Sequence, residues 1–207
     1  MNKIILASQS PRRRDLLEQM GVVFSVVPSK FREQLDNSRP PDEVAIELAL
    51  GKAKDVAAQF PDHVVIGSDT VVTIAGEQLE KPPDIAAARE MLRSISGKPH
   101  IVSTGIAVVW ADQSIELTEV ASAWVVFKNL NETAIEAYLA TGDSLDKAGG
   151  YGIQSGAADL INYVVGDFDV IIGLPTKKLA QMLQENLGIK ARAAHIDLPV
   201  RRIDKTS

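Results

Sequence analysis

The sequence contains no cysteine and few aromatic side chains. Phenylalanine, tryptophan and tyrosine together make up only 5% of its 207 residues. The absence of thiols excludes disulfide bonds, zinc sites built on cysteine and thiol-based catalysis. The three histidines, His63, His100 and His195, are widely separated and show no metal-ligand spacing.

A leader sequence and long apolar runs are also lacking. Met1-Asn2-Lys3 precedes only four apolar residues, which is too short for a signal peptide. No apolar run approaches the roughly 18 residues of a membrane span. We therefore expect a cytoplasmic protein with no membrane partner. The net charge of −5 argues against a nucleic acid polymer as partner, so a local basic cluster indicates a small anionic ligand.

The pattern of apolar residues predicts an α/β fold, because strand signals alternate with helix signals. With 45% hydrophobic residues, the chain can bury the core of one domain or of one two-lobed domain. Predicted strands cover residues 3–7, 22–27, 64–67, 71–74, 101–110, 115–127, 160–165 and 170–172. Predicted helices begin after Ser10 and cover residues 42–59, 85–95, 132–139 and 175–186. Residues 189–207 have no clear periodicity and are interpreted as an extension of uncertain order.

The segment SQSPRRR, residues 8–14, combines a helix start with an unusual charge. Ser10 suits the N-cap and the following proline suits the first helical position. A helix start prefers acidic residues, and each cation placed there costs about 0.3–1 kcal/mol, yet three arginines follow. Backbone N–H groups, serine hydroxyls and guanidinium groups all donate to oxyanions, which indicates a phosphate site. The alternative is a solvated basic helix end, in which Arg14 is partly offset by Glu18.

Four further charged residues are candidates for a site. Asp69 follows an apolar strand and can hold Mg²⁺ or accept a proton from water, although an Asp-Thr turn is the alternative. Lys52 is in line with the apolar stripe of its helix and either points into a cleft or extends its ammonium group to water. Lys81 stands before two prolines and can reach a phosphate or be simply exposed. Glu33, in a polar loop, indicates nothing by itself.

A glycine-rich segment at residues 149–156 suggests a dinucleotide site at first sight. Its spacing is GxGxxxG and no predicted strand leads into it, so the dinucleotide interpretation fails. No GxxxxGK[ST] sequence is present, which excludes a P-loop. The loop is either a backbone-lined contact for a planar ligand, with Tyr151 and Gln154 as polar or stacking groups, or an irregular turn.

These segments, in this order, resemble the Maf family of septum-formation-associated nucleoside triphosphate pyrophosphatases. The resemblance covers about residues 3–185 and leaves out the tail. It rests on LASQSPRRRDLL, Glu33, GKAK, GSDTVV, LEKPPD, SISGKPH, STGIAVV, EAYLATGDSLDKAGGYGIQ and GDFDVIIGLP. It implies an elongated mixed β-sheet flanked by helices, similar to the inosine triphosphatase type, with an active-site cleft between two lobes. On this basis we expect a pyrophosphatase domain over residues 1–187 and an extension over 188–207.

The resemblance also implies an activity and a set of site residues. The reaction would convert a nucleoside triphosphate to the monophosphate and pyrophosphate with a divalent metal, Mg²⁺ or Mn²⁺. Asp69 would be the catalytic proton acceptor, assisted by Lys52 and Lys81. The phosphate site would consist of Ser8, Arg13, Lys52 and Lys81. Glu33 and Asp69 would be the acidic residues near the metal.

Three positions bear on the choice of nucleotide. Arg12, Thr70 and Gln154 resemble the branch of the family that acts on dTTP and UTP, whereas the 7-methyl-GTP branch differs there. We therefore expect a dTTP/UTP pyrophosphatase. The alternatives are an enzyme of the 7-methyl-GTP type and a regulatory nucleotide-binding protein of cell division. A homodimer is expected from the family alone.

Overall fold

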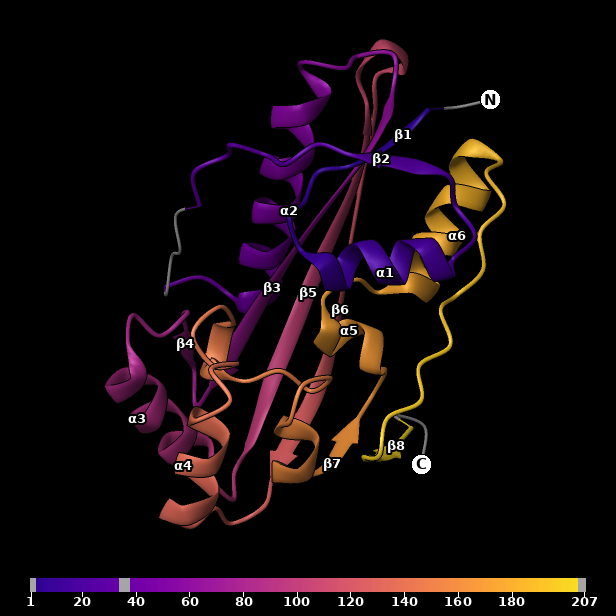
Figure 1. Ribbon diagram of the computed structural model, residues 1–207. Helices are drawn as coiled ribbons and strands as arrows, with labels where there is room; N and C mark the ends of the chain where they lie inside the picture. Colours follow the sequence, from indigo (N-terminus) through magenta and orange to yellow (C-terminus); the bar gives the residue numbers. More distant parts are fainter. Residues whose placement is uncertain (1–2, 34–37, 205–207) are drawn as a thin grey trace. The chain divides into compact units, whose positions relative to one another are not determined.

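The structure, a computed structural model, describes residues 3–33 and 38–204 (Figure 1). It is a mixed α/β fold with an eight-stranded sheet of order β2-β1-β3-β5-β6-β7-β8, in which β4 pairs with β3. The strands are β1 Ile4–Leu6, β2 Phe24–Val26, β3 Val64–Ile74, β4 Glu77–Leu79, β5 Pro99–Trp110, β6 Ile115–Phe127, β7 Ile161–Val165 and β8 Arg201–Ile203. The predicted α/β fold with a mixed sheet flanked by helices is confirmed.

The helices agree with most of the predicted ranges. They are α1 Pro11–Gln19, α2 Pro41–Ala57, α3 Ile85–Ile95, α4 Glu132–Leu139, α5 Phe168–Ile172 and α6 Thr176–Leu187, with short 3₁₀ turns η1 Ala111–Gln113, η2 Ala148–Gly150 and η3 Ala157–Leu160. Side chains cap the starts of α3 and α4, where Asp84 and Asn131 accept hydrogen bonds from the amides of Ala87 and Ala134. Among the described residues, no helix combines the length and apolar character needed to cross a membrane.

The chain divides into two compact units. The first comprises Met1–Thr70, Thr104–Ala121 and Gly173–His195, and the second comprises Val71–Ser103, Ser122–Ile172 and Ile196–Ser207. Both units are therefore assembled from segments far apart in the sequence.

In the first unit, β1 pairs in parallel with both β2 and β3, so that Ile4 is opposite Phe24 and Val64. The helix α2 packs against β1 and β3 with an alanine-rich face, because Ala49 and Ala53 belong to the same buried cluster as Ile5 of β1 and Val65 of β3. The apolar stripe that the sequence predicts in line with Lys52 is confirmed, because Val44, Leu48 and Val56 are buried.

Two glycines allow α2 to lie very close to the sheet (Figure 1). A Cβ atom at Gly67 of β3 would lie 2.2 Å from the carbonyl oxygen of Ala49, and one at Gly105 of β5 would lie 2.2 Å from that of Ala45. Real Cβ atoms essentially never come within 3.0 Å of heavy atoms outside their own residue and its two chain neighbours. The backbone of α2 therefore rests directly on the two strands.

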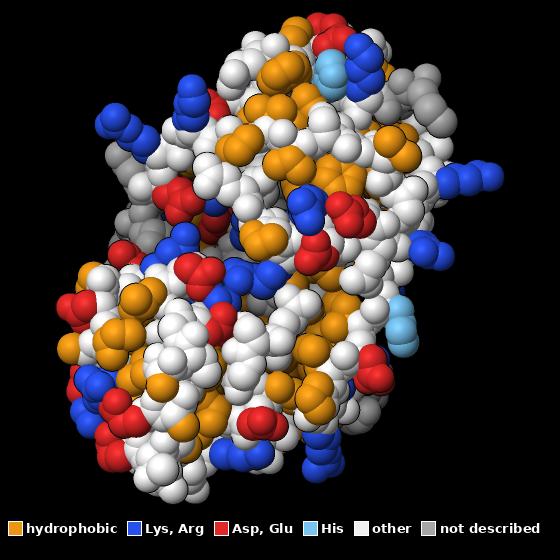
Figure 2. All heavy atoms as spheres, in the orientation of Figure 1, with side chains coloured by type: hydrophobic (Ala, Val, Ile, Leu, Met, Phe, Trp, Pro, Cys, Tyr) orange, Lys and Arg blue, Asp and Glu red, His pale blue; other side chains and the backbone are white. Residues whose placement is uncertain are grey.

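In the second unit, β7 pairs antiparallel with β6 and parallel with β8. The helices α3 and α4 are linked by ion pairs: Arg93 contacts Glu132 with N–O distances of 3.0 and 2.7 Å, and Arg89 contacts Glu136. Figure 2 shows the basic and acidic side chains gathered over these helices at the lower left. Because the pairs are exposed to solvent, each contributes little to stability.

One predicted element is wrong. The sequence predicts a strand over residues 170–172, but they belong to the helix α5, which ends at Ile172 and is followed by Gly173 with φ of 118°. A short apolar run fits a buried strand and a buried helix equally well. Burial of Val170 and Ile172 satisfies the apolar pattern in the helical form. The tail, for which no element was predicted, contains β8.

Candidate functional site

The start of α1 forms as the sequence predicts. Ser10 is the N-cap, and its hydroxyl accepts a hydrogen bond from the Arg13 amide at 3.4 Å. No acidic residue is present in the first turn. Arg14 is exposed and contacts Glu18 at 3.5 Å, the pair that the sequence indicates. Arg12 is half-buried. The charge conflict at this helix start is therefore retained in the folded protein.

The Arg13 guanidinium is held by uncharged oxygens. Its Nε donates to the carbonyl of Gly173 at 2.8 Å, and its terminal nitrogens donate to Ser8 Oγ at 3.4 Å and Thr70 Oγ1 at 3.2 Å. Burial lowers the pKa of Arg13, although the charge of Asp69 opposes this. An arginine stays protonated in proteins. A cation held in this way keeps N–H groups and charge available for an anion.

The acceptors Gly173 and Thr70 are held in place by residues that no sequence pattern indicated. The Ser68 hydroxyl lies 2.9 Å from the carbonyls of both Gly105 and Gly173. The hydroxyls of Thr70 and Thr104 are 3.0 Å apart. A Cβ at position 173 would come 3.1 Å from Thr70 Oγ1, and the positive φ there also favours glycine. The signal in the sequence was Gly173 between an apolar run and Leu-Pro, but that pattern does not identify Arg13 as its partner.

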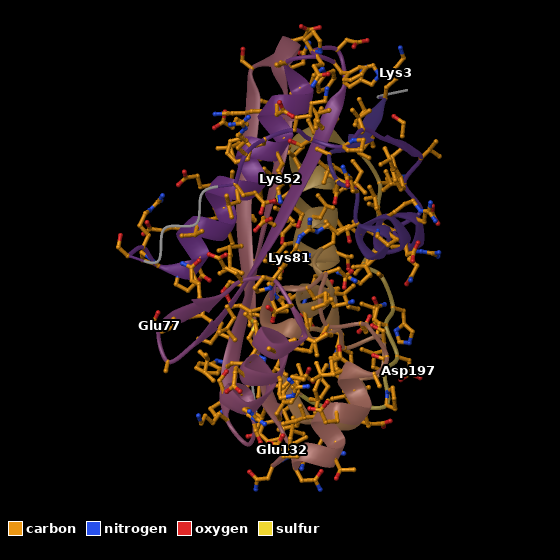
Figure 3. All side chains as sticks on the ribbon, turned by 60° about the vertical axis from the view of Figure 1, so that its left-hand side comes forward. Lys3, Lys52, Glu77, Lys81, Glu132 and Asp197 are labelled. Atoms are coloured by element: carbon orange, nitrogen blue, oxygen red, sulfur yellow. The ribbon has the colours of Figure 1, made fainter. Side chains whose placement is uncertain are left out.

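Lys52 joins two carboxylates. Its Nζ donates to Asp69 Oδ1 and lies 2.6 Å from Glu33 Oε1. The side chain of Lys52 is 12% exposed and that of Asp69 is 10% exposed, whereas Glu33 is 46% exposed. Figure 3 shows Lys52 on α2 alongside β3. Of the two possibilities left open by the sequence, the structure selects the inward one, because the ammonium group contacts carboxylates of the protein.

Glu33 and Asp69 have the chemistry of magnesium ligands. Mg²⁺ prefers oxygen donors and is often held by one or two carboxylates together with substrate phosphates and water. Both carboxylates contact the same ammonium group, so they face a common point. Residues 3–33 and 38–204 contain no cluster of three or more acidic, histidine or cysteine side chains that could hold a metal by themselves. The donor set therefore fits a cation shared with a phosphorylated ligand.

Lys81 and Gln154 belong to the second unit. Lys81, labelled in Figure 3, follows β4 and precedes Pro82. Its side chain is exposed. Gln154 is exposed on the glycine-rich loop. The loop is bonded to the segment that carries Lys81, because the Gly149 amide donates to the Glu80 carbonyl at 3.2 Å. Lys81 and the loop with Gln154 are thus connected through the backbone.

A buried lysine anchors the same loop. Lys147 is 7% exposed, and its Nζ donates to the side chains of Asp143 at 2.6 Å and Asp146 at 2.5 Å. The other oxygen of Asp143 accepts hydrogen bonds from Tyr138 at 2.9 Å and Ser155 at 2.6 Å. This network fixes Ser155, the residue that follows Gln154 in the chain. The sequence pattern showed these residues but gave no reason to connect them.

An α/β fold in which a helix start rich in arginine lies beside a lysine–carboxylate cluster is typical of proteins that bind phosphorylated ligands. Residues 3–186 match the family described as Maf-like protein. The chain belongs to this family.

The chain is similar to several curated relatives over most of its length. It is 42% identical over 185 residues to a Bacillus cereus protein named dTTP/UTP pyrophosphatase, covering 89% of this chain and 96% of the relative. It is 44% identical over 183 residues to a protein of the same name from Moorella thermoacetica, covering 88% of this chain and 94% of the relative. A solved nucleoside-triphosphatase / dITP/XTP pyrophosphatase from Mycobacterium abscessus has a TM-score of 0.40 and 13% identity, over 62% of this chain and 75% of that one.

Proposed function

We propose that this protein is a nucleoside triphosphate pyrophosphatase that hydrolyses dTTP and UTP to the monophosphate and pyrophosphate. The observation that carries the proposal is the contact of Lys52 with Asp69 and Glu33, in the same unit as the arginine-bearing start of α1. The relatives at 42% and 44% identity support the choice of substrate, because both are named for dTTP and UTP. In this proposal the catalytic domain covers residues 1–187.

The cationic residues position the triphosphate. Phosphoryl transfer depends mainly on orientation and on stabilisation of the charge that develops on oxygen. Arg13, whose guanidinium is fixed by Gly173, Ser8 and Thr70, offers its remaining N–H groups to phosphate oxygens. The Ser8 hydroxyl and the ammonium groups of Lys52 and Lys81 are the other phosphate-binding groups. The anion that the helix start lacks in its own sequence is then the substrate.

Asp69 handles the proton. The oxygen of a water molecule attacks the α-phosphorus, and the bond from that phosphorus to the oxygen bridging to the β-phosphate breaks. One proton of the water passes to the Asp69 carboxylate, and the bridging oxygen leaves with pyrophosphate. Lys52 holds Asp69 Oδ1 through its hydrogen bond and so orients the carboxylate. No covalent intermediate with the enzyme forms.

A divalent cation, Mg²⁺ or Mn²⁺, would be held by Glu33 and Asp69. When bound, it supplies charge neutralisation on the phosphate oxygens. The two carboxylates keep negative charge beside the triphosphate, and Lys52 keeps them close together.

Arg12, Thr70 and Gln154 select the nucleotide in this proposal. Thr70 is fixed by Arg13 and by the Thr104 hydroxyl, so its position depends on the phosphate site. Gln154 presents its amide from a loop that Lys147 anchors. An amide can both donate to and accept from the edge of a pyrimidine base.

The test is pyrophosphate release from a panel of canonical and modified nucleoside triphosphates at saturating Mg²⁺. We expect dTTP and UTP to be the preferred substrates and Asp69→Asn to abolish release. Asp112→Asn, a change in the turn η1, is the matched control and keeps the activity. Preference for 7-methyl-GTP would contradict the assignment of Arg12, Thr70 and Gln154. Tight UTP binding without turnover would favour the regulatory alternative, and full activity of Asp69→Asn would contradict the mechanism.

A further inference from the structure

Glu33 contacts Lys52 although the segment that carries it has no regular secondary structure. Residues 28–33 form neither helix nor strand, and Glu33 lies 2.6 Å from Lys52 Nζ. A loop does not hold a carboxylate at one place by itself, since its residues lose conformational freedom when they are fixed. Some other contact must fix this segment against α2.

Asp55 of α2 provides such a contact. Its Oδ2 accepts a hydrogen bond from the Ser29 hydroxyl at 2.8 Å and another from the Lys30 amide at 2.7 Å. The Ser29 hydroxyl in turn accepts from the Phe31 amide at 3.0 Å. Hydrogen bonds to a carboxylate are about twice as strong as those between neutral groups. Asp55 lies three residues after Lys52, so both side chains emerge from the same face of α2.

Gly51 provides the second contact. The ring of Phe31 lies where a side chain at position 51 would be, because a Cβ there would come 2.4 Å from Phe31 Cζ. Glycine in a helix interior is less stable than alanine, and Gly51 is well inside α2. The packing of Phe31 against the bare helix backbone explains why glycine occupies this position.

We propose that Asp55 and Gly51 are positioning residues that dock the segment Ser29–Glu33 on α2 and thereby place the Glu33 carboxylate at Lys52 and Asp69. They touch neither substrate nor metal and act through Glu33. Asp55 fixes the beginning of the segment through the Ser29 hydroxyl and the Lys30 amide, and Gly51 receives Phe31, two residues before Glu33. The inference rests on the proposed function for the role of Glu33, but the docking itself does not depend on that role.

The two residues can be tested separately from the stability of the fold. Gly51→Ala favours the helix and meets only the end of the exposed Phe31 ring, so the protein stays folded while the ring is displaced. Asp55→Ala removes the acceptor of two hydrogen bonds. The matched control is Glu47→Ala, which removes a carboxylate from α2 that pairs with Arg39 instead.

The first measurement is hydrogen–deuterium exchange of the peptide covering residues 29–33. We expect exchange at least about tenfold faster in Asp55→Ala and Gly51→Ala than in the wild type, and unchanged exchange in Glu47→Ala. In a Phe31→Ala background, Gly51→Ala should have no further effect, because the added methyl group then displaces nothing. Unchanged exchange in both variants would overturn the proposal.

The second measurement is pyrophosphate release from dTTP as a function of Mg²⁺ concentration. Asp55→Ala should raise the Mg²⁺ concentration for half-maximal rate by about tenfold, as residues that orient metal ligands do. In a Glu33→Ala background it should have no further effect, because its action passes through Glu33. Equal effects in both backgrounds would overturn the proposal. If the wild type releases no pyrophosphate, the proposed function fails, while faster exchange in both variants still supports the docking.

Discussion

Gly67 of β3 lies directly against the carbonyl oxygen of Ala49 on α2, at a distance that leaves no space for a Cβ atom. This contact sets the separation between the helix that carries Lys52 and the strand that carries Asp69. The hydrogen bond between Lys52 and Asp69 therefore depends on Gly67, which takes no part in that bond.

Gly67→Ala should separate α2 from β3. The added methyl group meets backbone atoms that cannot rotate away, so we expect a loss of about 1–3 kcal/mol in the free energy of unfolding together with loss of pyrophosphate release. Urea unfolding and an activity assay measure the two effects. Gly51→Ala is the comparison for stability, since its methyl group meets only the end of a side chain. Equal stability of Gly67→Ala and the wild type would show that the close approach does not matter.

Arg13→Lys should lower pyrophosphate release by about 100-fold, which is typical when a positioned donor to a developing charge is removed. A lysine cannot donate simultaneously to Gly173, Ser8 and Thr70 and to a phosphate. Steady-state kinetics with dTTP measure the effect.

Arg14→Lys is the matched control for that variant. Arg14 is exposed and contacts Glu18 and Asp15 at the surface, so its replacement should change the rate by less than about twofold. Similar losses in both variants would mean that the arginines act as a general positive charge, without separate roles.

Lys147→Met should destabilise the glycine-rich loop. The substitution leaves Asp143 without its buried cation, and breaking a buried ion pair costs about 3 kcal/mol. We expect a lower urea midpoint and weaker discrimination between dTTP and dGTP, because Gln154 loses its support. Lys128→Met, at an exposed lysine bonded to a backbone carbonyl, should change stability by less than about 0.5 kcal/mol. Unchanged discrimination between dTTP and dGTP in Lys147→Met would show that the Lys147 network does not contribute to nucleotide selection.

His100 should make stability depend on pH. Burial lowers the pKa of His100 to about 4, and its Nε2 lies 2.7 Å from the Tyr151 hydroxyl. Below pH 6.5 the unfolded chain binds a proton that the folded protein does not, so stability falls as the pH drops from about 6.5 to about 4. We expect a loss of about 2 kcal/mol between pH 7 and pH 5 from this group.

Urea unfolding at the two pH values measures that loss. His100→Leu cannot take up a proton, so its unfolding should depend less on pH over the same interval. An identical pH dependence in the wild type and in His100→Leu would assign the effect to other groups.

Local features of the fold could be predicted from the sequence. The start of α1 at Ser10 and the caps at Asp84 and Asn131 follow from interactions within three residues of the chain, which short motifs encode. The helix α5 could not be predicted, because its apolar run is too short to show a period and its conformation depends on burial.

For the candidate site too, residues marked by a local pattern could be predicted, whereas contacts between distant segments could not. Lys52 was identifiable because a charge on an apolar stripe is uncommon, and Asp69 because it follows a buried strand. The carbonyl group that accepts from Arg13 could not be identified, since Gly173 is 160 residues away in the sequence. Gly67 and Gly51 have no side chain, so only the packing of the folded chain shows why glycine occupies these positions.

The strand in the tail affects whether molecules of this protein can associate through the edge of the sheet. The strand β8, beyond the residues that match the family, pairs with β7 and is the outermost strand on that side of the sheet. An uncovered β7 would present unpaired backbone groups to which strands of other molecules can add. A three-residue strand with exposed Arg201 and Arg202 takes its place, and short edge strands with charged side chains discourage such addition. The chain thus carries its own protection against aggregation at this edge.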